Sequence, residues 1–215
     1  MIKVVKFGGS SLANAEQFKK VKDIIKSDSS RRFVVPSAPG KRFSADTKVT
    51  DMLYGCYKLA EEDSDFDDAL KAIHDRYQEI IDGLGLKASL DDAFETIRKD
   101  FKAHAGREYA ASRGEYLNGM LMAEYLGFPF LDSAEYIFFT EDGTFDAEKT
   151  NTALAKKLAG MENAVIPGFY GSLPSGKIKV MSRGGSDITG SLVAAACYAD
   201  LYENWTDVSG ILMAD

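Results

Sequence analysis

The first forty residues show a hydrophobic pattern that predicts a strand, a helix and a second strand. Residues 2–7 form a run rich in β-branched residues that stops at Gly8-Gly9, where the backbone can turn tightly. Asn14 is placed to cap a helix, and apolar residues then recur at helical spacing over residues 18–25. A second hydrophobic run at residues 31–37 completes a β-α-β unit, which favours a parallel sheet.

The middle of the chain has the periodicity of helices. From about Val49 to Leu126, apolar residues recur at intervals of three and four. Gly83, Gly85 and Gly106 are the expected breaks between successive helices. This region is therefore predicted to hold several helices and no strand.

Short strands return in the last third of the chain. The pattern predicts strands at residues 136–139, 164–166 and 177–181, with helices at residues 147–158 and 188–199. Residues 183–187 are expected to form the loop before the last helix. The alternation of strands and helices predicts an α/β fold.

Composition agrees with one soluble globular domain. The chain has 215 residues, of which 45% are hydrophobic and 27% charged, so it can bury a sizeable core. The formal net charge of -7 disfavours non-specific attraction to a phosphate backbone, and we expect no nucleic-acid partner. No signal sequence and no long apolar run is present, which predicts a cytoplasmic protein without a membrane segment.

Cysteine, histidine and clustered acidic residues give no convincing metal or redox site. Cys56 and Cys197 lie in apolar helical runs and are interpreted as small buried hydrophobic residues. His74 and His104 lack the spacing of paired ligands and are expected at the surface. The acidic cluster Asp63–Asp68 is interpreted as a solvated loop followed by a helix start. We therefore predict no metal ligands.

Three glycine-containing or polar segments are candidates for chemistry. Lys6-Phe7-Gly8-Gly9-Ser10 places a lysine and exposed backbone amides at a strand end, which suits phosphate, although a simple turn explains it equally well. Ser182-Arg183-Gly184-Gly185-Ser186-Asp187 is the stronger signal, since a charged pair flanking glycines favours an anionic ligand. Trp205–Ile211 could equally be a surface hairpin.

Taken together, ordered motifs along nearly the whole chain resemble the aspartate kinases of the amino-acid kinase superfamily. Besides the first and second segments above, the motifs are Ser37-Ala38-Pro39-Gly40, Thr50-Asp51-x-Leu53, Ser112-Arg113-Gly114-Glu115, Gly168-Phe169 and Thr206-Asp207-Val208-x-Gly210-Ile211. The resemblance implies a three-layer αβα sandwich with a mostly parallel central sheet. A dinucleotide-binding oxidoreductase is disfavoured, because the third glycine and the acidic ribose partner are missing.

The resemblance also implies roles for individual residues. Lys6 is expected on the transferring phosphates, Arg183 on the α-carboxylate of aspartate, and Glu115 near its α-ammonium. The full expectation is catalytic Lys6 and Asp187; substrate-binding Ser37, Thr50, Glu115, Phe169 and Arg183; and nucleotide-binding Gly8, Gly9, Ser10, Thr206 and Asp207.

The implied reaction is transfer of the γ-phosphate of ATP, with Mg²⁺, to the β-carboxylate of L-aspartate. This is the first step of lysine, threonine and methionine biosynthesis, and the family resemblance implies a homo-oligomer. In the family the last motif runs on, whereas this chain ends at Asp215. We therefore expect residues 1–215 to be a catalytic domain truncated in its nucleotide-binding half, without regulatory domains. The alternatives are another member of the superfamily or a fragment that binds without turnover.

Overall fold

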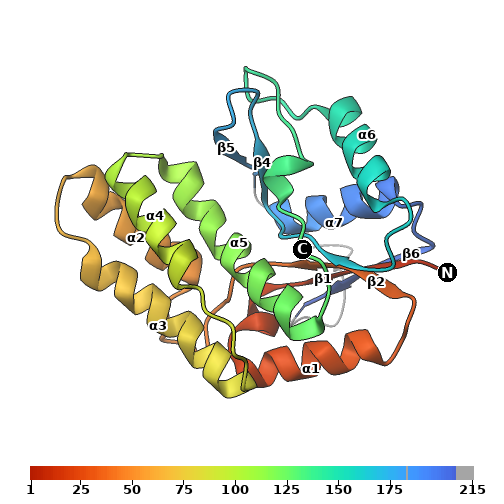
Figure 1. Cartoon of the computed structure of the whole chain (residues 1–215), viewed down its shortest axis with the longest axis horizontal. Coiled ribbons are helices and arrows are strands. Elements are labelled where there is room, and N and C mark those ends of the chain that lie inside the picture. The colour runs from red at the N-terminus through yellow and green to blue at the C-terminus, as the bar shows by residue number, and fades with distance from the viewer. Residues whose placement is uncertain (183, 207–215) are drawn as a thin grey trace, which may run out of the picture.

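Four short parallel strands form the central sheet of the chain (Figure 1). The computed structural model describes residues 1–182 and 184–206. The strands are β1 (Lys3–Phe7), β2 (Arg31–Pro36), β3 (Ala164–Val165) and β6 (Leu201–Trp205), in the order β3-β2-β1-β6. Both Val4 and Val5 are fully buried although they point to opposite faces, so the sheet is covered on both sides.

Two layers of helices cover the sheet (Figure 1). On one side α1 and α5 pack against Val5, Phe7 and Val34, and α2, α3 and α4 extend this layer. On the other side α6 and α7 pack against Val4 and Phe33. The helices are α1 (Ala15–Lys26), α2 (Val49–Glu61), α3 (Asp67–Leu84), α4 (Asp91–Lys102), α5 (Arg107–Leu126), α6 (Ala147–Leu158) and α7 (Gly185–Ala196), with 3₁₀ turns η1 (Gly9–Leu12) and η2 (Ser133–Glu135). The predicted αβα sandwich is confirmed.

Local signals located several elements accurately. The side chain of Asn14 accepts a hydrogen bond from the Gln17 N–H at 3.0 Å, which is the expected cap of α1. The break predicted at Gly83 is wrong, because this residue lies inside α3. A Cβ on Gly83 would come within 2.6 Å of the Ala15 Cβ, so the glycine allows α3 to approach α1 closely.

Of two further predicted strands, one forms and the other does not. Residues 136–139 form no regular strand, and only Phe138 and Phe139 make isolated bridges. The strand predicted at residues 177–181 is β5 (Ile178–Val180), which pairs antiparallel with β4 (Tyr170–Ser172) in a separate two-stranded sheet. Neither segment joins the parallel sheet: in residues 136–139 the Phe139 N–H donates to Ser172 of β4, whereas the Phe138 N–H donates to the Thr150 side chain.

The last helix begins earlier than its apolar pattern predicts. It starts at Gly185, so Ser186 and Asp187 lie in the first turn of α7 and not in a loop.

Of the two cysteines, Cys56 is buried and Cys197 is only partly buried, and both are free thiols. Within residues 1–182 and 184–206, no helix is both long and apolar enough to cross a bilayer.

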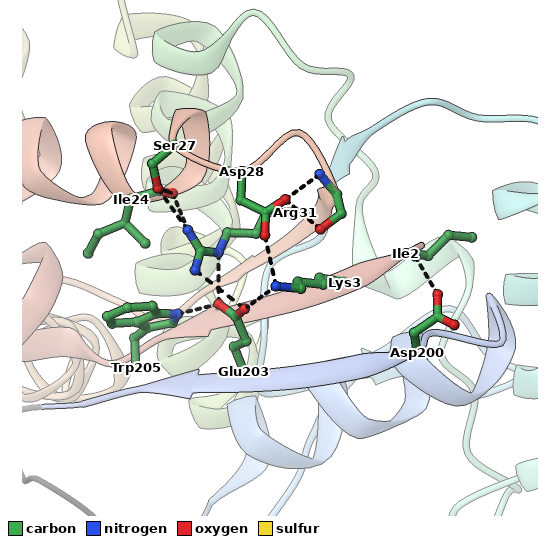
Figure 2. Close-up of polar contacts among 10 residues, drawn as sticks. Ile2, Lys3, Ile24, Ser27, Asp28, Arg31, Asp200, Glu203 and Trp205 are labelled. Atoms are coloured by element: carbon green, nitrogen blue, oxygen red, sulfur yellow. Dashed lines mark hydrogen bonds and ion pairs between the residues drawn. The ribbon is translucent and has the colours of Figure 1, made fainter.

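A charged network ties the edge strand β6 to its neighbours (Figure 2). Glu203 accepts a hydrogen bond from Arg31 Nε at 2.8 Å and from the Trp205 indole N–H at 2.9 Å, and Lys3 Nζ lies 3.4 Å away. Burial alone would raise the pKa of Glu203, but the hydrogen bonds from Arg31 and Trp205 outweigh burial and leave the pKa lowered. The network therefore links β6 to β1 and β2 through charged side chains.

Candidate active site

A cavity of about 600 Å³ lies where the carboxyl ends of β1, β2 and β6 meet the helix layer. This edge of a parallel sheet is the usual place for a ligand crevice. Several residues predicted for the site line the cavity, although they come from five separate segments: Gly8, Gly9, Ser10, Ser37, Thr50, Glu115 and Thr206.

Two loops of the cavity are in direct backbone contact. The Gly40 N–H donates a hydrogen bond to the Gly9 carbonyl at 2.8 Å. A Cβ on Gly40 would lie 2.6 Å from the Gly9 carbonyl carbon, and a Cβ on Gly9 would lie 2.8 Å from the Ala38 carbonyl oxygen. The loops after β1 and β2 therefore behave as one wall, and only glycine fits at these two positions.

Glu115 places a buried carboxylate in this cavity. The residue is 6% exposed, and its Oε2 has no hydrogen-bond partner among the described residues. Burial raises the pKa of Glu115 to about 8, although the Ala38 N–H partly offsets this by bonding the carboxylate. A buried carboxylate that faces a cavity without a cationic partner is suited to bind a cationic group of a ligand.

Lys6 joins the glycine loop to α7. The residue is 8% exposed, and its Nζ lies 2.6 Å from Asp187 Oδ1 in the first turn of α7. A Cβ built on Gly8 would be 3.7 Å from the same Nζ, so the ammonium lies beside the glycine loop. The structure thus brings together two residues that are far apart in the sequence and that were both predicted as catalytic.

Phe169 lies against the start of α7 and does not line the cavity. Its φ of +82° is unusual for a residue with a large side chain. Its N–H donates to Thr189 Oγ1 at 3.1 Å, and its carbonyl accepts from the Met181 N–H at 2.8 Å. These bonds hold the strained backbone next to the turn that carries Asp187.

Two predicted site residues lie in the part of the chain that the structure does not describe. Arg183 and Asp207 are not among the residues that the structure describes, so their predicted contacts stay predictions.

The sequence analysis did not predict a residue that supports the site. Asn118, one helical turn after Glu115, is fully buried and donates from Nδ2 to the Ser37 carbonyl at 2.7 Å. Its spacing of three residues from Glu115 was the available signal.

The family model described as "Amino acid kinase family" matches residues 1–215. The chain belongs to the amino acid kinase family. Among curated relatives, this amino acid kinase chain is 37% identical over 226 residues to a Bacillus subtilis protein named aspartokinase 3, covering 98% of the chain and 49% of that relative. It is 29% identical over 235 residues to the lysine-sensitive aspartokinase 3 of Escherichia coli, covering 100% of the chain and 51% of the relative.

Solved structures show the same fold as this amino acid kinase chain. An aspartate kinase of Clostridium acetobutylicum superposes with a TM-score of 0.95 and 52% identity, covering 100% of this chain and 49% of that one. Escherichia coli aspartokinase III, in complex with aspartate and ADP, gives a TM-score of 0.83 and 26% identity over 98% of this chain and 50% of that one. The chain thus spans about half the length of the relatives it matches.

Proposed function

We propose that this protein is an aspartate kinase, which transfers the γ-phosphate of ATP to the β-carboxylate of L-aspartate to give 4-phospho-aspartate. The observation that carries the proposal is the buried carboxylate of Glu115 in a cavity shared with the glycine loop. The names of the relatives support it, as does the complex of the Escherichia coli enzyme with aspartate and ADP. The cavity of about 600 Å³ is large enough for an amino acid beside the phosphates of a nucleotide.

In this proposal Glu115 pairs with the α-ammonium of aspartate. Arg183 holds the α-carboxylate, and a guanidinium can do so through two parallel hydrogen bonds. The two charges of opposite sign would select a zwitterionic amino acid. Ser37 and Thr50, which line the cavity, complete the amino-acid pocket. Phe169, which packs beside Gly185 of α7 outside the cavity lining, is proposed to contact the substrate from that side.

The phosphates are proposed to lie at the glycine loop. Gly9 and Ser10 offer backbone amides at the cavity wall, and the Lys6 ammonium lies beside the loop. Gly8 is also proposed to approach the phosphates, although its N–H already donates to the Trp205 carbonyl at 3.1 Å. Thr206 and Asp207 are proposed to contact the nucleotide. Asp187 holds the Lys6 ammonium in place through the 2.6 Å ion pair, so the lysine is oriented before the substrates bind.

The reaction needs no general base. The side chain of free aspartate has a pKa of about 3.9, so its carboxylate is already an anion at neutral pH. A carboxylate oxygen forms the new bond to the γ-phosphorus while the bond from phosphorus to the β-phosphate oxygen breaks and ADP leaves. The main obstacle is repulsion between the carboxylate and the triphosphate, which Lys6 and the loop amides reduce.

Mg²⁺ would further neutralise the triphosphate when it enters with ATP. Within residues 1–182 and 184–206, no cluster of three histidine, cysteine, aspartate or glutamate residues is arranged to hold a metal ion. Magnesium in kinases is bound largely by phosphate oxygens and waters, with one or two carboxylates. The described residues fit that mode, and we assign no protein ligand to the ion.

Further parts of the proposal concern the full-length protein. We propose that it is a cytoplasmic homo-oligomer in which residues 1–215 supply the amino-acid pocket and part of the nucleotide site. The support is the family resemblance and the half of the relatives' length that this chain spans. For this reason turnover is best measured on the full-length protein.

Selectivity among acidic amino acids tests the proposed substrate. We expect calorimetry to show binding of L-aspartate and binding at least tenfold weaker for L-glutamate, because an extra methylene moves one carboxylate away from its partner. Succinate, which lacks the ammonium, is the matched control for Glu115 and should also bind weakly. Equal affinity for aspartate and succinate would contradict the assigned role of Glu115.

A further inference from the structure

A buried arginine on α3 contacts both loops that form the cavity wall. Arg76 is 3% exposed. Its Nη2 donates to the carbonyl of Ala13 at 3.1 Å and to the carbonyl of Gly40 at 2.8 Å. Its Nη1 donates to Asp46 Oδ2 at 2.7 Å. A single rigid guanidinium therefore binds chain segments that lie 30 or more positions away from it in the sequence.

Each of these segments belongs to the cavity or adjoins it. Ala13 follows η1, which continues the glycine loop, and Gly40 is the residue whose backbone contacts Gly9. Asp46 lies in the segment 41–48, which contributes Lys41, Phe43 and other residues to the cavity lining. Arg76 itself does not line the cavity, so it acts on the site from behind the wall.

The segment around Asp46 depends on side-chain contacts for its shape. Residues 41–48 form no helix or strand, and the Asp46 N–H donates to the Phe43 carbonyl at 3.0 Å. The Asp46 carboxylate also accepts from the Arg42 N–H and from Arg42 Nε, both at 2.9 Å. With a side chain only 9% exposed, Asp46 is the point at which the segment attaches to Arg76.

We propose that Arg76 is a positioning residue, which holds segment 41–48 against the glycine loop and so fixes the geometry of the substrate cavity. The consequence for substrates depends on the proposed function, whereas the effect on the loops does not.

The details of the burial argue against a role in packing alone. Arg76 Nε is buried and has no hydrogen-bond partner among the described residues, so the site is not optimised for stability. A buried ion pair is commonly replaced by apolar residues without loss of stability. Neither an apolar residue nor a lysine has the planar guanidinium that bonds Gly40, Ala13 and Asp46 at the same time.

The test compares Arg76→Lys with Arg98→Lys as a matched control. Arg98 also extends from a helix to an aspartate, Asp67, but this exposed pair lies away from the cavity. In Arg76→Lys we expect the backbone amide of Gly40 to exchange hydrogen at least about tenfold faster, because a charged hydrogen bond to its loop is lost. The KM for aspartate should rise about tenfold, and kcat should change less than threefold, since bound substrate restores the ordered loop. Arg98→Lys should change none of these.

Two other results for Arg76→Lys would contradict the proposal. If Arg76→Lys is folded and both Gly40 exchange and KM equal those of the wild type, Arg76 only fills space and the proposal is wrong. Faster exchange with unchanged KM would overturn the link to substrate geometry.

If Arg76→Lys does not fold, Asp46→Asn serves instead. It keeps the shape of the side chain and is expected to change Gly40 exchange and KM in the same way. A wild-type protein that fails to bind aspartate would contradict the proposed function, while Gly40 exchange in the variant would still test the positioning of the loops.

Discussion

Replacing Lys6 by methionine in the full-length protein is expected to lower kcat by roughly a hundredfold to a thousandfold while aspartate binding remains measurable. The Lys6 ammonium is buried beside the glycine loop and lies 2.6 Å from Asp187. Methionine keeps the length of the side chain but removes its charge. It also leaves the Asp187 carboxylate unpaired beside the phosphates, which adds repulsion to the lost attraction.

Lys3→Met is the matched control for this variant. Lys3 lies on the same strand, but its Nζ pairs with Asp28 at 2.8 Å and it does not line the cavity. Its replacement should affect stability and leave kcat within about threefold of the wild type. Steady-state kinetics gives kcat, and calorimetry gives aspartate affinity. A Lys6→Met protein that turns over at the wild-type rate would remove Lys6 from the mechanism.

Replacing Glu115 by glutamine is expected to weaken aspartate binding about a hundredfold at pH 8.5 and above. At that pH the wild-type carboxylate is ionised, since its pKa is about 8, and it can pair with the α-ammonium of the ligand. Glutamine has nearly the same shape but no charge. Glu124→Gln, an exposed position on the same helix, is the control and should leave affinity unchanged.

The pH dependence provides a sharper form of the same prediction. An ammonium ligand binds the ionised form of Glu115, so wild-type affinity for aspartate should fall roughly tenfold for each pH unit below about 8. The Glu115→Gln protein should lack this dependence. Calorimetry between pH 6 and pH 8.5 measures both, and parallel pH profiles for the two proteins would contradict the role of Glu115.

Without ligand, the stability of the folded protein should decrease as pH rises, whereas its affinity for aspartate should increase. The pKa of Glu115 is raised on folding from its ordinary 4.5 to about 8, so the folded protein binds the proton more tightly than the unfolded chain. The contribution of this group to the free energy of unfolding therefore decreases as pH rises from about 4.5 to about 8. We expect Glu115→Gln to be at least as stable as the wild type at pH 8.5 in denaturant unfolding, although it binds aspartate poorly.

Much of the fold follows from local sequence signals. Asn14 marks the start of α1, and the limits of α6 agree with its apolar periodicity, because caps and helical spacing are encoded by neighbouring residues. The strand predicted at residues 136–139 failed because pairing depends on the partner. Phe138 faces Ser172 in the β4–β5 hairpin, which is distant along the chain.

The candidate site was predictable only in part for a similar reason. The glycine loop and Glu115 lie in short motifs, whereas Arg76 reaches Ala13 across 63 positions and Gly40 across 36. Nothing in the residues around Arg76 distinguishes it from an arginine on a solvated helix face. Only the packing of α3 on α1 brings its guanidinium behind the cavity.

The most direct test of the account is to trap the product of the proposed transfer. The full-length protein is incubated with ATP, Mg²⁺, L-aspartate and hydroxylamine, which converts an acyl phosphate into a stable hydroxamate. We expect aspartate β-hydroxamate and ADP in equal amounts, both formed at least about a hundredfold more slowly by Lys6→Met. Release of ADP and inorganic phosphate without hydroxamate, or hydroxamate formed equally well from glutamate, would contradict it.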